Sequence, residues 1–328
     1  MEREITIHLP NGEDHKFRPV KEVPITPAKR EIIFPDKKVH RVDWRTDFKV
    51  MQDTQAQIKE AEVTQKEATV NVPLDIKDLP CLVWIPSDKH IGSAQTDYQL
   101  LKDHTELVIN TPNAFEISIG DDVDNGIWGG LAFEQVLPPQ MQGFMIKDLA
   151  EEMNGRNDRK KCITLARCTG NHTDWGFDKT GESWESIWYG SSDAPIFAGM
   201  GLVRLHVGDQ EYQVAISHRY WGQSKLNPTN ACKRFLEYEY TEADCALIGH
   251  DHVAEILEFY RNGKRRIAAK TGTYKMEDQW ARKQGISGRG QRGGMAILFW
   301  PDEHRMQPFL KLEDAVSYLN LLKEIKGF

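Results

Sequence analysis

Short apolar runs alternate with longer amphipathic segments through the middle of this 328-residue chain. The runs Cys81–Ile85, Phe115–Ile119 and Cys245–Ile248 are rich in apolar residues, which is typical of buried strands. Lys161–Thr169 and Tyr212–Ser217 are further strand-like segments. Strands that alternate with helical segments predict a layered α/β domain.

Helical stripes occupy the intervals between these strands. One stripe predicts a helix face made of Tyr98, Leu101, Thr105 and Val108. A second stripe predicts a helix that packs its apolar side chains into the core: Met141, Phe144, Met145, Leu149 and Met153. A strand-like run, Met295–Trp300, and a final helix over Asp314–Ile325 follow.

Residues 1–76 have a different character. Ile5, Ile7 and Leu9 alternate with polar residues before Asn11-Gly12, a pattern that predicts a β-hairpin. Several prolines follow, and then a stretch rich in Gln, Glu and Thr. We therefore expect an N-terminal arm or accessory segment over 1–76 and a catalytic domain over 77–328. The arm could pack on that domain, support a homo-oligomer or be partly disordered.

Composition places the chain among ordinary globular proteins. The hydrophobic fraction is 40% and the net charge is −7, which does not favour nucleic-acid binding and does not exclude it. No run approaches the roughly 18 apolar residues of a membrane span, so we expect no membrane association. No apolar segment follows Met1-Glu2-Arg3-Glu4, and the five cysteines contain no C-x-x-C pair. The cytoplasm is the expected location.

Five polar clusters come directly after strand-like runs. They are Asp88-Lys89-His90, Gly120-Asp121-Asp122-Val123-Asp124, Gly170-Asn171-His172, His218 and Gly249-His250-Asp251-His252. Open α/β sheets place their ligands at the carboxyl ends of strands. Two divalent ions about 3.5–4 Å apart need bridging carboxylates and neutral imidazoles, and a mixed set of nitrogen and oxygen donors suits Mn, Fe or Zn. A structural site would be closed, with four ligands that are mostly Cys and His.

The order D-x-H, G-D-x-x-D, G-N-H, H, G-H-x-H resembles the calcineurin-like metallophosphoesterase superfamily, over roughly Leu82–Tyr274. The short start Asp88 to Gly92 is most similar to the DNA-repair nuclease branch and its bacterial phosphodiesterase relatives. The resemblance implies a four-layer αββα sandwich of two mixed β-sheets, with a dinuclear metal site at the strand ends.

The resemblance also implies a role for each motif residue. Asp88, His90 and His252 would hold one ion, and Asn171, His218 and His250 the other. Asp121 would bridge the two ions, and a metal-bridging hydroxide would be the nucleophile. His172 would act as the general acid, with Asp124 hydrogen-bonded to it. Manganese is the favoured ion, with iron, zinc, nickel and magnesium as alternatives.

Two departures from the family pattern bear on the substrate. Thr173 stands where many members have an acidic residue, and Asp174 follows it. The phosphatase branch has arginines after its second and third motifs. Here Asn125 follows Asp124, and no arginine occurs between His172 and Trp184. The missing arginines favour phosphodiesters over phosphomonoesters.

Aromatic and basic residues near the motifs suggest a nucleic-acid substrate. Trp128, Trp175 and Trp221 each follow a motif residue by three or four positions, and could stack on bases or simply pack the loops. Arg219 and Lys89 are candidate phosphate contacts. Basic residues at 264–266 and in the Gly-rich stretch 285–294 could follow a phosphate chain or form solvated surface.

The sequence therefore predicts a metal-dependent phosphodiesterase, with DNA as the leading substrate. One alternative is a phosphomonoesterase or small-nucleotide phosphodiesterase. The other is a metal-bound interaction module without catalysis.

Overall fold

A computed structural model describes two short strands in the N-terminal part of the chain and most of the remainder. The described residues are 5–8, 14–17, 66–126, 134–154, 163–180, 194–224, 226–276 and 292–327. The chain divides into two compact units, Met1–Glu60 and Ala61–Phe328. In the first unit, β1 (Ile5–His8) pairs antiparallel with β2 (Asp14–Phe17). This pairing confirms the two strands of the predicted hairpin.

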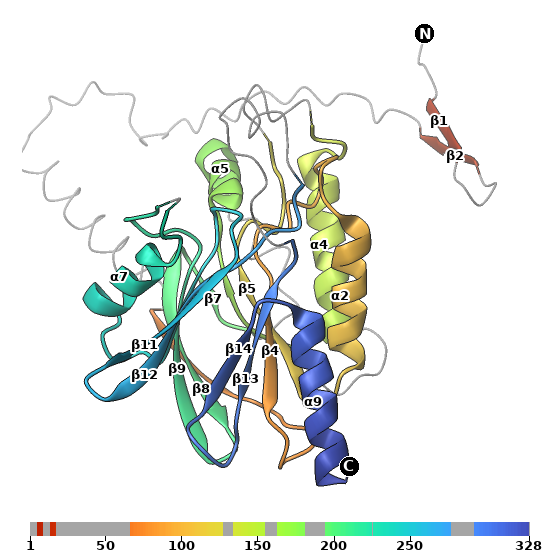
Figure 1. The fold of residues 1–328 in the computed structure, drawn as a ribbon. Coiled ribbons are helices and arrows are strands. Elements are labelled where there is room, and N and C mark those ends of the chain that lie inside the picture. The colour runs from red at the N-terminus through yellow and green to blue at the C-terminus, as the bar shows by residue number, and fades with distance from the viewer. Residues whose placement is uncertain are drawn as a thin grey trace, which may run out of the picture. The chain divides into compact units, whose positions relative to one another are not determined.

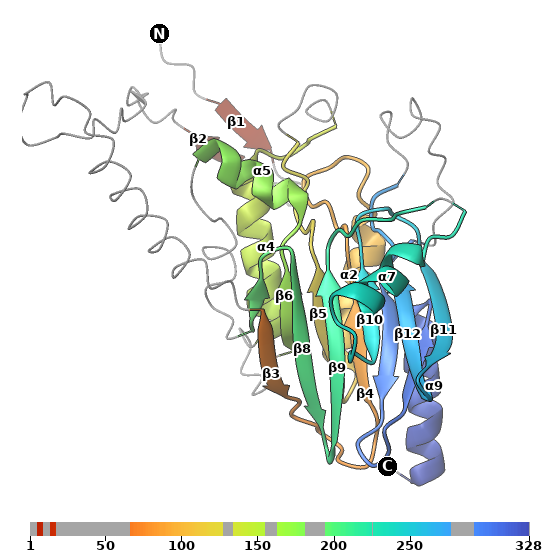
Figure 2. The ribbon, with the colours of Figure 1, turned by 90° about the vertical axis from the view of Figure 1, so that its left-hand side faces the viewer.

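Two six-stranded sheets form the second unit (Figures 1 and 2). One sheet has the order β11 (Glu255–Arg261), β12 (Lys264–Lys270), β10 (Cys245–Ile248), β9 (Gln210–Ser217), β8 (Met200–Val207) and β3 (Glu67–Asn71). The other has the order β14 (Met306–Phe309), β13 (Met295–Phe299), β4 (Cys81–Ile85), β5 (Ala114–Ile119), β6 (Thr164–Cys168) and β7 (Ile196–Phe197). Both sheets mix parallel and antiparallel pairs.

Alternation along the strands separates the apolar side chains into layers. Cys81, Val83 and Ile85 of β4 face the other sheet, in a core shared with Val214 and Ile216 of β9. Leu82 and Trp84, the intervening residues of β4, pack in a second core against helices. Both faces of the strand are covered, which explains its continuous apolar run.

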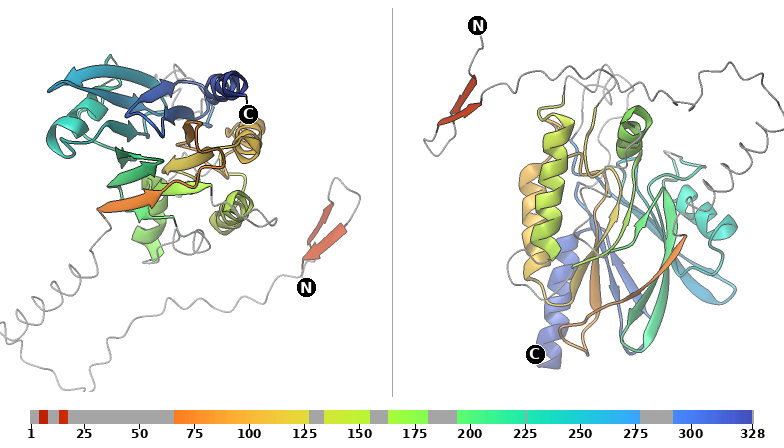
Figure 3. Two further views of the ribbon diagram at one scale, coloured as in Figure 1. Left: turned by 90° about the horizontal axis from the view of Figure 1, so that it is seen from below. Right: turned by 180° about the vertical axis from the view of Figure 1, so that it is seen from behind.

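Helices cover the outer face of each sheet (Figure 3). The second core joins the sheet of β4 to α2 (Tyr98–Asn110), α4 (Pro139–Asn154) and α9 (Leu312–Lys326). A third core joins the sheet of β9 to α7 (Asn230–Tyr238). The αββα sandwich implied by the resemblance is thereby confirmed. Among the described residues, no helix combines the length and hydrophobicity of a membrane-crossing segment.

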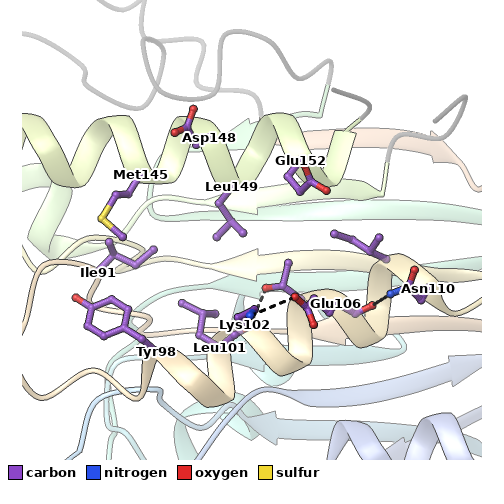
Figure 4. Close-up of a pocket in the computed structure, with 12 residues that line it drawn as sticks. Ile91, Tyr98, Leu101, Lys102, Glu106, Asn110, Met145, Asp148, Leu149 and Glu152 are labelled. Atoms are coloured by element: carbon purple, nitrogen blue, oxygen red, sulfur yellow. Dashed lines mark hydrogen bonds and ion pairs between the residues drawn. The ribbon is translucent and has the colours of Figure 1, made fainter. Parts of the chain in front are cut away.

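The predicted core face of α4 is wrong by about one position. The helix buries Gln142, Gly143, Ile146, Ala150 and Met153, so only Met153 of the predicted stripe is fully buried. The other four residues of the predicted stripe each lie next to one of these buried positions in the sequence. Met141, Phe144 and Met145 are exposed. Met145 and Leu149 line a groove of about 660 Å³ between α2 and α4 (Figure 4).

Strand β3 lies before the boundary expected at residue 76 and is hydrogen-bonded into a sheet of the second unit. It runs parallel to β8, with Ala68 opposite Val203 and Val70 opposite Leu205. Ala68 belongs to the core between the sheets. The segment 66–76 therefore contributes to the same packed unit as the motif-bearing strands.

Candidate metal centre

The candidate ligands lie on backbone that L residues rarely adopt. Among the described residues, eight that are not glycine have positive φ, and five of them are Asp88, His90, Asp121, His250 and His252. Left-handed backbone at non-glycine residues costs free energy and concentrates at functional sites. The conformation follows from the place of the motifs, because each loop turns sharply as it leaves a strand.

The first group of donors consists of Asp88, His90 and His252. His252 Nε2 lies 3.1 Å from Asp88 Oδ1 and 3.1 Å from His90 Nε2. Asp88 is fully buried, and its Oδ1 has no hydrogen bond among the described residues. Burial and the nearby His172 together lower the pKa of His90 to about 4. A neutral imidazole is the form that binds a metal.

The second group consists of Asp121, His218 and His250. His218 Nε2 lies 3.0 Å from Asp121 Oδ2 and 3.1 Å from Asn171 Oδ1. Its other ring nitrogen, Nδ1, donates to the carbonyl of Ile119 at 2.8 Å, which fixes the ring so that Nε2 faces the ligands. The His218 and His250 ring centroids are 5.2 Å apart.

Asp121 lies between the two groups. It belongs to the second group and also to a set with His90 and His172, whose ligand atoms lie within 4.8 Å of one another. Its Oδ1 accepts a hydrogen bond from the backbone N–H of His172, which leaves Oδ2 toward His218. Asp121 is therefore close to candidate donors of both groups.

These donors fit divalent metal ions. Imidazole nitrogens and carboxylate and amide oxygens converge in two groups, and Asp88 Oδ1 is an orphaned buried acceptor in one of them. The absence of a side chain at Gly170 allows the Asp121 carboxylate to lie against that backbone, since a Cβ at Gly170 would be 2.1 Å from Asp121 Oδ1. His and Asp side chains in this arrangement can hold metal ions.

His172 lies at the start of α5 (Asn171–Thr180) and is buried. Its Nδ1 contacts the backbone carbonyl of Asp124 rather than the carboxylate. Nε2 therefore faces the donors, 3.8 Å from Asp121 Oδ2. Thr173 beside it is buried, and Asp174 is exposed.

The Asp124 carboxylate has a different pair of partners. Its Oδ1 lies 3.1 Å from His90 Nδ1 and 3.0 Å from Lys275 Nζ. Burial raises the pKa of Asp124, but the interactions with His90 and Lys275 outweigh it and lower that pKa to about 2. Asp124 thus contacts a candidate metal ligand with its side chain and the candidate acid with its backbone.

Lys275 is the site residue that the motifs did not reveal. It is buried, follows β12 by five positions and reaches Asp124 from outside every predicted cluster. No local pattern distinguishes it from other lysines. The nearest signal was its place after a strand-like segment, at the same sheet edge as the other motifs.

Lys89 points away from the donors, into a buried network of four charges. Its Nζ lies 3.0 Å from Glu116 Oε1 and 2.7 Å from Asp122 Oδ1. Arg167 completes the network, at 3.3 Å from Glu116 and 3.6 Å from Asp122. The hypothesis that Lys89 contacts a phosphate is therefore wrong. The lysine fixes the first motif to the second.

Two of the three candidate tryptophans lie among the described residues. The Trp175 ring packs on His172, with centroids 4.1 Å apart and planes inclined by 38°. Trp221 is 54% exposed, and Arg219 is exposed. Trp128 lies outside the described residues.

Two of the described basic residues pair with acidic side chains. Lys264, Arg265 and Arg266 belong to the amino half of β12, where Arg265 pairs with Glu258 of β11. Arg292 pairs with Asp97 at 3.1 Å. Arg282, Lys283 and Arg289 lie outside the described residues.

Comparisons with known proteins find likenesses in structure alone. No family model matches the chain, and no curated protein sequence matches it. Vps29 of Entamoeba histolytica complexed with Zn²⁺ gives a TM-score of 0.35 at 9% identity, covering 69% of this chain and 96% of that one. Pseudomonas putida nuclease MPE gives 0.31 at 13%, covering 69% and 87%. GAP50, the anchor in the inner membrane complex of Plasmodium, gives 0.36 at 13%, covering 74% and 94%. Likenesses this distant say nothing about activity.

Proposed function

We propose that this chain, which has the fold of the calcineurin-like metallophosphoesterases, is a dinuclear metal-dependent phosphodiesterase that acts on DNA. The observation that carries the proposal is the arrangement at the sheet edge. Two donor groups lie on either side of Asp121, and the Nε2 of a non-ligand histidine, His172, faces them. A site that only binds metal has no need of that fifth imidazole.

Each ion would have its own donors in this chain. Asp88, His90 and His252 would hold one ion, Asn171, His218 and His250 the other, and Asp121 both. Bound there, divalent ions would supply an activated water and would offset negative charge on the phosphate oxygens. The donor set suits manganese, and iron, zinc, nickel and magnesium remain alternatives.

His172 would supply the proton for the leaving oxygen. Its Nδ1–H is engaged by the Asp124 carbonyl, so the ring is held with Nε2 toward the donors. When the phosphorus–oxygen bond breaks, the Nε2 proton of a protonated His172 would pass to the departing oxygen. Trp175, packed on the same ring, limits its rotation and shields it from water.

The residue after Asp124 supports a phosphodiester substrate. Asn125 is buried, and its side-chain amide donates to the backbone carbonyl of His172 at 2.8 Å. Its backbone N–H donates to Gln142 Oε1 at 2.9 Å. In the phosphatase branch, a phosphate-binding arginine stands at this position. In this chain Asn125 stands there and binds the backbone at the start of α5.

The test is hydrolysis with Mn²⁺ by the wild-type protein and by His172→Ala. The substrates are a small aryl phosphodiester, the matching phosphomonoester, single-stranded DNA and double-stranded DNA. We expect cleavage of the diester and of DNA, reduced by a factor of about 10² or more in His172→Ala with metal content nearly unchanged. Normal turnover by that variant would remove His172 from the mechanism.

The alternatives give different results in the same experiment. Turnover of the phosphomonoester alone would indicate a phosphatase, and turnover of small diesters without DNA would indicate a small-nucleotide phosphodiesterase. Two bound ions without turnover of any substrate would indicate a metal-bound interaction module.

A further inference from the structure

We infer that Trp221, Tyr238 and Arg234 form a stacking platform for an unpaired base of the substrate strand, so that the enzyme acts on single-stranded DNA. This inference rests on the proposed phosphodiesterase function and deepens it. The three residues come from the loop after β9 and from α7, and are called the Trp221 platform below.

The two aromatic side chains of the platform are partly exposed to solvent. Trp221 is 54% exposed and Tyr238 is 64% exposed. Their rings are stacked, with centroids 5.7 Å apart and planes inclined by 30°. The Arg234 guanidinium carbon lies 4.5 Å from the centroid of the Trp221 ring. Large aromatic side chains exposed together, with a cation beside them, are what base-stacking sites require.

The loop that carries Trp221 is held firmly against α7. Tyr220 is buried, packs on Phe235 at a centroid distance of 4.8 Å and donates its hydroxyl to Glu239 at 3.0 Å. Asn230 donates its side-chain amide to the carbonyl of Gly222 at 2.6 Å. The platform is therefore ordered before any ligand arrives, which lowers the entropy cost of binding.

The short distance along the chain between the platform and the candidate metal centre indicates what the platform would bind. Trp221 follows the candidate ligand His218 by three residues, and three residues span at most about 11 Å. The exposed Arg219 lies between them in the chain and can neutralise a phosphate. A strand that places one phosphodiester at the metals would therefore bring a neighbouring base near the platform. Bases in an intact duplex are already stacked, so an unpaired base is the fitting occupant.

The experiment measures binding in the slowly cleaving His172→Ala background with Mn²⁺, over times too short for that variant to cleave the probe. The probes are a short single-stranded oligonucleotide and versions in which one base after another is replaced by an abasic residue. Phosphate charge is the same in all of them, so differences in affinity isolate stacking. We expect one abasic position to weaken binding about tenfold, the range typical of base–aromatic stacking.

Substitutions in the platform should remove that difference. Trp221→Ala should bind intact and abasic strands almost equally, whereas Trp221→Phe, which keeps an aromatic face, should retain most of the preference. Tyr238→Ala, which removes the ring stacked on Trp221, should reduce the preference as well. The matched control is Tyr260→Ala, which removes another exposed tyrosine. Tyr260 lies opposite Arg265 at the amino end of β12, away from the candidate ligands, so the preference should stay.

Failure of the platform and failure of the proposed function are distinguishable. If the wild-type protein cleaves DNA and no abasic position weakens binding, the platform is overturned and the phosphodiesterase proposal stands. An equal loss for intact and abasic strands in Trp221→Ala would also overturn it, because it would indicate a packing role. If no strand is bound or cleaved, both proposals fail. Tighter binding of duplex than of single strands would overturn the single-stranded substrate.

Discussion

Individual side chains decide whether two ions can be held side by side. Among the described residues, Asp121 is the one carboxylate grouped with candidate donors from both sets. Replacing it with alanine should remove both ions, because neither group keeps enough negative charge to offset the cost of dehydrating a cation. Metal content per chain, measured by mass spectrometry after gel filtration, checks the prediction. Two ions retained in Asp121→Ala would contradict the bridging role. Asp209→Ala, which removes an exposed carboxylate from the β8–β9 turn, should keep both ions.

The contact between Lys275 and Asp124 predicts how the stability of the protein depends on pH. The folded pKa of Asp124 is depressed to about 2, so its contribution to stability is present above its unfolded pKa and is lost as pH falls toward 2. Lys275→Met removes a buried partner of that carboxylate. We expect the metal-free variant to lose about 2 kcal/mol of unfolding free energy at pH 7. The pH-dependent part of its stability should also shrink, because without Lys275 the folded pKa of Asp124 moves back toward its unfolded value.

Urea unfolding with a chelator between neutral and acidic pH measures this change. Lys102→Met is the matched control, since Lys102 is 65% exposed and pairs with Glu106 along one helix. Such pairs contribute about 0.3–0.5 kcal/mol, so this control should change little. Equal effects of the two substitutions would show that Lys275 does not stabilise Asp124.

Sequence motifs identified most of these residues, because ligand chemistry restricts residue type and the strand ends restrict position. They could not identify Lys275, because it contacts Asp124 from 151 positions further along the chain. Nor could they show that the Asp124 backbone carbonyl, not its carboxylate, contacts His172. Every residue has a carbonyl, so a sequence carries no signal for such a contact.

Between elements, a buried charge network joins three neighbouring strands. Glu116 of β5 lies 3.0 Å from Lys89, which follows β4, and 3.3 Å from Arg167 of β6. Burial raises the pKa of Glu116, but the two cations outweigh it and hold that pKa below its ordinary value. Glu116→Gln keeps the shape and removes the charge. We expect a loss of about 3 kcal/mol, because two cations remain buried with one carboxylate fewer.

Chemical denaturation at neutral pH tests this role of Glu116. Both the unfolding free energy and its dependence on denaturant concentration are recorded. Metal affinity should fall as well, since Lys89 lies between the candidate ligands Asp88 and His90. Unchanged stability and unchanged affinity would show that the network does not position the first motif.

The elements were predictable where burial is complete on both faces. Cys81–Ile85 and Cys245–Ile248 were predicted with the bounds that β4 and β10 have. Strand β11 was missed because it lies at a sheet edge and is only partly buried. Its sequence therefore mixes polar and apolar residues and lacks the continuous apolar run of a central strand. The face of α4 was misjudged because large apolar residues were assumed to point inward, whereas Met141, Phe144 and Met145 are exposed.

At the scale of the whole molecule, the family resemblance predicted the two-sheet sandwich. It did not predict β3, the edge strand beside β8. Strand β3 has only five residues, EATVN, with one buried position. Its pairing with β8 joins positions more than 130 residues apart, which local periodicity cannot reveal. The contact-based division after Glu60 therefore differs from a division after residue 76 by one structural strand.

That difference can be tested with two shortened chains, one beginning at residue 61 and the other at residue 77. The first keeps β3, so its thermal midpoint should match that of residues 61–328 in the full chain. The second loses Ala68 and Val72 from the core and leaves β8 as an uncovered edge. We expect it to be less stable by about 3 kcal/mol, which is about 8 °C for a unit of this size, and to aggregate on heating. Calorimetry and light scattering measure both effects. Equal midpoints would mean that β8 does not need β3, and that the packed unit begins with β4.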